Sequence, residues 1–121
     1  MTDRALNILL VDDEPLVRRS VRRALRGHQV VEASTGLEAL ELLAQERFDG
    51  ILCDLLMPGM GGIEFWRELN SRDPAQCRRL VIMSGSPRSG QRLLPEWVRV
   101  LEKPLEPGVL QDVVEGWHSS T

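Results

Sequence analysis

The stretch NILLVDDEP, residues 7–15, joins a short uninterrupted apolar run to three consecutive acidic residues and a proline. A run of this length with polar residues at its end is typical of a strand that is buried on both faces. Proline is well tolerated in the first turn of a helix, where its missing N–H is not needed. We therefore predict a strand over residues 7–11 that ends at Asp12 and Asp13, followed by a helix that begins at Pro15.

The same alternation of apolar runs and amphipathic segments repeats along the chain. Apolar runs over residues 29–33, 50–54, 80–83 and 98–101 predict four further strands. Residues 84–97 leave room only for a short or distorted fourth helix, because Pro87, Gly90 and Pro95 interrupt them. The arginines between residues 15 and 27 are interpreted as a solvated helix face. The apolar faces that we predict for the other helical segments consist of Val17, Val21, Ala24 and Leu25; of Leu37, Leu40, Leu43 and Ala44; of Ile63, Trp66 and Leu69; and of Leu110, Val113, Val114 and Trp117.

Alternating strands and helices indicate an α/β fold, a doubly wound parallel sheet of five strands with helices on both faces. The length of 121 residues, 42% of them hydrophobic, predicts a single domain over residues 1–121. A net charge of −3 and the lack of a long apolar run argue against nucleic-acid and membrane partners. Cys53 and Cys77 fit neither a disulfide framework nor a zinc pattern, so we expect a cytoplasmic location.

Chemistry-bearing residues follow the predicted strands, at the edge where ligands bind in such sheets. They are Asp12, Asp13, Asp54, Ser84 and Lys103, which is the only lysine of the chain. Converging carboxylates repel one another unless a cation compensates, and a set of oxygen ligands without His or Cys favours Mg²⁺. The Asp54 carboxylate can attack phosphorus, while Lys103 and Ser84 can bind phosphoryl oxygens.

These residues resemble the motifs of response regulator receiver domains from two-component signalling. The resemblance covers nearly the whole chain, through LLVDDEP (9–15), DLLMPGMGG (54–62), MSG (83–85) and EKPL (102–105). It implies a flavodoxin-like or CheY-like sheet in the order 2-1-3-4-5, with Asp54 as the phosphoacceptor for a histidine kinase or phosphotransfer domain. It also implies Mg²⁺ held by Asp13, Asp54 and the Leu56 backbone carbonyl, with Asp12 acting mainly through water, and a cis bond between Lys103 and Pro104.

The chain departs from the family pattern in three places. Val100 stands where many receivers carry an aromatic switch residue, Gly61 replaces a common acidic residue, and the segment after Ser84 is short. We therefore expect intact phosphorylation chemistry with a different output mechanism. The clustered arginines of the first helix, the short segment and the LEKPL run resemble the receivers found at the end of hybrid sensor histidine kinases.

Other interpretations of the same residues stay open. Asp12 and Asp13 fit a helix N-cap, and Ser84 fits an ordinary turn. Trp97 and Trp117 fit either the core or an interface with a kinase or a second copy of the chain. The alternative function is a receiver-like docking module whose output does not depend on phosphorylation. In both cases we expect a signalling module and not an enzyme, because Leu56 stands where an aspartyl phosphatase carries a second acid.

Overall fold

Five parallel strands form one sheet in the computed structural model, which describes residues 4–119 with the side chains of residues 87, 89 and 90 left aside. The order β2-β1-β3-β4-β5 is the predicted one. The strand bounds lie within one residue of those expected from the apolar runs. They are β1 (Asn7–Val11), β2 (Gln29–Ala33), β3 (Gly50–Asp54), β4 (Leu80–Ser84) and β5 (Arg99–Glu102).

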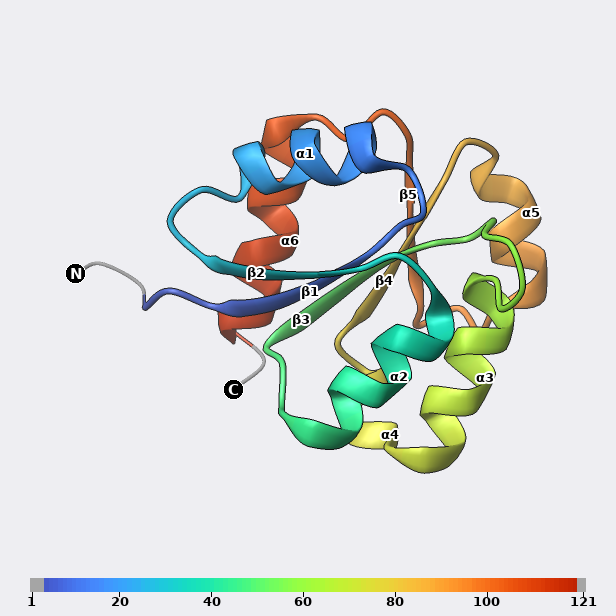
Figure 1. Cartoon of the computed structure of the whole chain (residues 1–121). Helices are drawn as coiled ribbons and strands as arrows, with labels where there is room; N and C mark the ends of the chain where they lie inside the picture. The colour runs from blue at the N-terminus through green and yellow to red at the C-terminus, as the bar shows by residue number, and fades with distance from the viewer. Residues whose placement is uncertain (1–3, 120–121) are drawn as a thin grey trace.

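Helices cover both faces of the sheet (Figure 1). One face carries α1 (Pro15–Ala24) and α6 (Pro107–Ser119). The other carries α2 (Gly36–Gln45), α3 (Gly62–Arg72), α4 (Pro74–Cys77) and α5 (Pro87–Leu93). The short helix predicted between the last two strands is α5, with 7 residues. Among residues 4–119, no helix combines the length and apolar character that a membrane span requires.

Alternate residues of each strand pack into two separate hydrophobic cores, because successive side chains of a strand point to opposite faces of the sheet. Ile8 and Leu10 join the core under α1 and α6, while Leu9 and Val11 join the core under α2 and α3. Trp117 belongs to the first core, with 5% of its surface exposed, and its indole Nε1 donates to the Arg79 carbonyl at 3.0 Å. Of the two roles predicted for Trp117, the core role is therefore confirmed.

The helical segments differ from the sequence prediction in two places. Leu37 is 61% exposed and Ala44 is also exposed, because α2 faces the core through Gly36, Ala39, Leu40 and Leu43 instead. Gly36 allows this rotation, since a Cβ there would lie 2.9 Å from the Met60 side chain.

The second difference concerns α3. Its most deeply buried residue is Phe65, whereas Ile63 and Trp66 of the predicted apolar face are only partly buried. Pro74 begins a further helix, α4, that the sequence analysis did not predict. The Asp73 carboxylate caps the N-terminus of α4 by accepting a hydrogen bond from the Gln76 N–H. A proline in the first turn serves to start a helix as well as to stop one.

Candidate functional site

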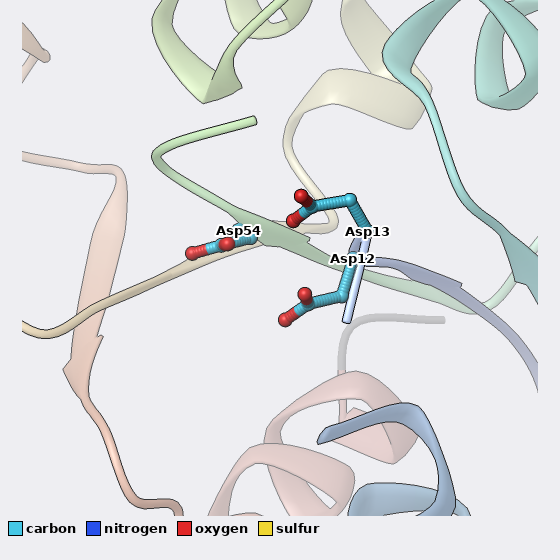
Figure 2. A group of neighbouring side chains, drawn as sticks. All are labelled: Asp12, Asp13 and Asp54. Atoms are coloured by element: carbon cyan, nitrogen blue, oxygen red, sulfur yellow. The ribbon is translucent and has the colours of Figure 1, made fainter. Parts of the chain in front are cut away.

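The carboxyl ends of β1, β3, β4 and β5 bring the predicted site residues to one edge of the sheet. Asp12 directly follows β1, Asp54 ends β3 opposite Met83 of β4, and Ser84 pairs with Glu102 of β5. Figure 2 shows the side chains of Asp12, Asp13 and Asp54 clustered beyond the strand ends. One carboxylate oxygen from each lies within 4.8 Å of the others.

Asp12 is held at both of its carboxylate oxygens. Its Oδ1 accepts a hydrogen bond from the Glu14 N–H at 2.9 Å, and its Oδ2 lies 3.0 Å from the Lys103 ammonium. The residue is fully buried. The N-cap of α1 is Glu14, whose side chain makes no capping bond, so Asp12 closes the turn before the helix and does not cap the helix itself. The position of this carboxylate is therefore fixed by the turn and by the lysine together.

Asp54 is the second buried carboxylate of the site, with 6% of its surface exposed. Its Oδ1 lies 3.2 Å from the Lys103 ammonium. Burial, and then the charge of Asp12, raise the pKa of Asp54 above its ordinary value of 3.8, while Lys103 and a hydrogen bond from the Leu56 backbone act in the opposite direction. The fold thus places the Asp54 carboxylate beside that of Asp12, and Lys103 only partly balances their negative charge.

Lys103 bridges the two buried carboxylates. Burial alone would lower the pKa of Lys103, but the hydrogen bond to Asp12 and the charges of Asp54 and Asp12 outweigh it, and the net pKa is raised. Its backbone N–H donates to the Ser84 carbonyl at 2.9 Å, and the Lys103–Pro104 bond is cis as expected. The ammonium is therefore charged at neutral pH and is anchored beside β4.

Ser84 and Leu56 flank this group. Ser84 is 2% exposed and its Oγ accepts a hydrogen bond from the Ser86 N–H at 2.9 Å, which is a turn interaction. The structure brings its backbone to Lys103 but gives no bond between its hydroxyl and Asp54. Leu56 exposes 78% of its surface and follows Asp54 in the loop. The roles predicted for the Ser84 hydroxyl and the Leu56 carbonyl stay predictions.

The loop after β3 depends on a glycine. The Gly62 N–H donates to the Leu55 carbonyl at 2.8 Å, and a Cβ at position 62 would lie 2.8 Å from the Asp54 carbonyl. No real Cβ approaches a carbonyl oxygen so closely. The absence of a side chain at Gly62 lets α3 begin directly against the end of β3 and sets the course of the loop that carries Leu56.

Arg18 is a residue of the site that the sequence analysis missed. Its Nη1 donates to the Asp12 carbonyl at 2.7 Å, its Nε donates to Glu32 at 3.1 Å, and its side chain is only 19% exposed. The sequence places it among the arginines of a solvated face, and Glu32 lies on another element. No local signal distinguishes it from its neighbours, because the contact depends on the pairing of β1 with β2.

The donor set fits a divalent cation. Three carboxylates against one ammonium leave a formal charge of −2 when all four groups are ionised. The ligand atoms are oxygens, which are the donors that hard cations such as Mg²⁺ prefer. With a divalent cation bound, the same site could also hold an anionic group between that cation and the Lys103 ammonium.

Comparisons with known proteins agree with this geometry. Residues 8–115 match the family described as the response regulator receiver domain. Response regulator MprA of Mycobacterium leprae is 44% identical over 68 residues, which is 54% of this chain and only 30% of that protein. The chemotaxis protein CheY4 of Vibrio cholerae is 29% identical, with a TM-score of 0.77 over 93% of this chain and 98% of its own. The receiver domain of sensor histidine kinase PA1611 from Pseudomonas aeruginosa, with a magnesium ion coordinated in its active site cleft, is 25% identical, with a TM-score of 0.82 over 95% of this chain and 98% of its own.

Proposed function

The chain belongs to the response regulator receiver domain family of two-component systems, and we propose that Asp54 accepts a phosphoryl group from a histidine kinase or phosphotransfer domain. The observation that carries the proposal is the Lys103 ammonium within 3.2 Å of one oxygen of the buried Asp54 carboxylate. A carboxylate nucleophile needs its charge compensated as it approaches a phosphoryl group, and this contact supplies a cation in advance.

The transfer exchanges one phosphorus bond for another. An Asp54 carboxylate oxygen attacks the phosphorus of a phosphohistidine, the P–O bond forms as the P–N bond breaks, and the leaving imidazole takes a proton from solvent. The product is an acyl phosphate on Asp54. Only the ionised carboxylate attacks, so the raised pKa of Asp54 predicts that transfer is lost as the pH falls through that raised value.

Lys103 and Ser84 are proposed to hold the phosphoryl oxygens. The Lys103 ammonium contacts both Asp12 and Asp54, so it can pair with a phosphoryl oxygen once the phosphoryl group is attached to Asp54. Ser84 lies at the same edge of the sheet, and its hydroxyl, an acceptor for Ser86, still has a proton to donate. Phosphoryl transfer needs little more from the protein than this positioning and charge stabilisation.

Asp12, Asp13 and Asp54, with the Leu56 backbone carbonyl, are proposed to hold Mg²⁺, which when bound neutralises phosphoryl oxygens. The clustered carboxylate oxygens support this assignment. Within this set, Asp12 is fixed by Glu14 and Lys103, while Asp13 is partly exposed and able to adjust.

The phosphoryl group adds strong negative charge at the edge of the sheet, and we propose that a partner reads the resulting shift in population. Val100 is a partly buried residue of the α2–α3 core and has no ring to reorient. We therefore expect the conformational response to phosphorylation in the segment after Ser84, because the Ser84 carbonyl accepts a hydrogen bond from the Lys103 N–H. We propose a cytoplasmic module, in keeping with its two buried free cysteines, that serves signalling and turns over no separate substrate.

The test is phosphorylation of the purified chain by a small phosphodonor such as acetyl phosphate, read as intact mass. The wild type should gain one phosphoryl group in Mg²⁺, and Asp54→Asn should gain none. The matched control is Asp49→Asn, because Asp49 is a partly buried carboxylate paired with a basic residue, Arg4, but directly precedes β3, at the end of the strand opposite to Asp54. Labelling of Asp54→Asn at another residue would refute the assignment.

A second candidate is a docking module whose output does not depend on phosphorylation, favoured by Val100 at the usual switch position. The two candidates differ in one measurable quantity, the affinity for a partner before and after phosphorylation. An affinity that does not change when Asp54 is fully phosphorylated supports the docking module and excludes a phosphorylation-driven output.

A further inference from the structure

A groove of about 810 Å³ lies between the second half of α1 and the outer edge of β2. We call it the arginine groove, because one of its walls is formed by Arg19, Arg22 and Arg23 of α1 and by Arg26 in the turn that follows the helix. Its remaining lining comes from residues 27–31, Asn7 and Glu46. Asn7 and Gln29 begin their strands, so the groove lies toward the end of the sheet opposite to Asp54. Nothing in the proposed phosphotransfer uses it.

The charge of this wall is largely uncompensated. Arg22 is paired with Glu32 at 2.7 Å, but Arg19, Arg23 and Arg26 are exposed and form no ion pair within residues 4–119. Arg19 and Arg23 are four residues apart on one face of α1, where like charges weaken the helix, and Arg26 lies in the turn beyond it. The helix dipole accounts for arginines in the last turn but not for Arg19. A positive strip thus stands on a chain whose net charge is −3.

The edge of β2 offers backbone groups beside this strip. The Gln29 N–H donates to the Leu6 carbonyl, and the Ala33 carbonyl accepts from the Asp12 N–H. In a parallel ladder with this register, the backbone N–H and C=O groups of residues 29, 31 and 33 bond to β1. The N–H and C=O groups of Val30 and Glu32 therefore point away from β1. β2 is the first strand in the sheet order, and Figure 1 shows it at the margin of the sheet. An open edge of this kind pairs with another strand.

We propose that the arginine groove binds an extended acidic polypeptide segment of a partner protein, which adds to the sheet alongside β2. Glu32 reaches α1 and Val30 packs in the α1–α6 core, so every second side chain at this edge faces the α1 side. An added strand would follow the same alternation. The segment is therefore expected to carry Asp or Glu at every second position, facing Arg19, Arg23 and Arg26.

A peptide fits this site better than a nucleic acid does. Guanidinium groups alone attract any polyanion, but the N–H and C=O groups of Val30 and Glu32 form a ladder only with another polypeptide backbone. The proposal does not rest on the proposed phosphotransfer, because no residue of the groove belongs to the Asp54 site.

The experiment measures the binding of a labelled peptide, Thr-Glu-Val-Glu-Val-Glu-Thr, by fluorescence anisotropy at low salt. Replacing Arg19, Arg23 and Arg26 with alanine should weaken binding about tenfold, which corresponds to about 0.5 kcal/mol for each lost contact. The matched control replaces Arg67, Arg88 and Arg92, three exposed arginines of α3 and α5, with alanine and should change affinity less than about twofold. Alanine favours helix at the substituted positions in α1, α3 and α5, and Arg26 is an exposed turn residue, so both triple variants should keep the circular dichroism of the wild type.

Two further probes separate strand addition from simple charge attraction. A peptide of the same composition with its three Glu residues adjacent, and the original peptide N-methylated at alternate residues, should both bind at least about fivefold more weakly. Binding of the original peptide should also slow hydrogen exchange at the Val30 and Glu32 amides. Equal binding of all three peptides, equal losses in the two triple variants, or arginine-dependent binding of an oligothymidylate without binding of the peptides would each overturn the proposal.

Discussion

Replacing Lys103 with methionine should destabilise the metal-free protein more than the loss of any exposed cation. The methionine keeps the apolar stem of the lysine and removes only the ammonium, which lies 3.0 Å from Asp12 and 3.2 Å from Asp54. Asp12 is fully buried and the Asp54 side chain is 8% exposed, so water cannot replace the lost partner. The variant therefore leaves two buried carboxylates without a countercharge.

The magnitude follows from the distance between the two carboxylates. Their nearest oxygens lie within 4.8 Å, which gives a repulsion of about 3.5 kcal/mol at an effective dielectric constant of about 20 when both are ionised. Removing one partner of a buried ion pair costs about 3–5 kcal/mol in measured cases, which agrees with this value. We expect the free energy of unfolding to fall by about 3 kcal/mol at pH 7, or about 10 °C in Tm.

Urea unfolding at pH 7 in EDTA measures this loss, with Arg99→Met as the control. Arg99 lies on the same strand β5, is exposed and forms no ion pair within the described residues, so its loss should cost less than about 0.5 kcal/mol. The deficit of Lys103→Met should shrink as the pH falls through the raised pKa of Asp54, and it should shrink when Mg²⁺ is added. A Lys103→Met variant as stable as Arg99→Met in EDTA would contradict the role of Lys103 as the countercharge of Asp12 and Asp54.

Two further substitutions test the charge balance and the packing. Asp54→Asn should stabilise the metal-free protein by about 1 kcal/mol at pH 7, since a raised pKa means that folding disfavours the ionised carboxylate beside Asp12. That advantage should fade as the pH falls through the raised pKa, and a variant less stable than the wild type throughout would contradict it. Gly50→Ala should cost about 1–3 kcal/mol and change the near-ultraviolet circular dichroism, because its Cβ would lie 2.1 Å from the Trp117 ring. Gly108→Ala, whose Cβ meets nothing within 4 Å, is the control, and an equal effect of the two would exclude the clash.

The strands and the site could be predicted from the sequence because both rest on short local patterns. Each strand is an apolar run of about the same length, and each site residue stands directly after such a run. Parallel pairing then brings the strand ends together with no further information. The turn between α1 and β2 contains Gly27, whose φ of 104° is a conformation that glycine adopts without strain.

The features that sequence analysis missed depend on contacts between distant elements. The exposure of Leu37 follows from the packing of Gly36 on Met60. Arg18 joins the site through Asp12 and Glu32, which pairing of β1 with β2 makes neighbours. Helical periodicity identifies a face only to within about one residue, so such contacts decide the final orientation.

The most direct test of the central proposal is the intact mass of wild type and Asp54→Asn after incubation with acetyl phosphate, with and without Mg²⁺. The wild type should gain one phosphoryl group, the gain should require Mg²⁺, and Asp54→Asn should gain none. A wild type that binds Mg²⁺ and yet gains no phosphoryl group, from acetyl phosphate or from any phosphorylated histidine kinase, would contradict the proposal.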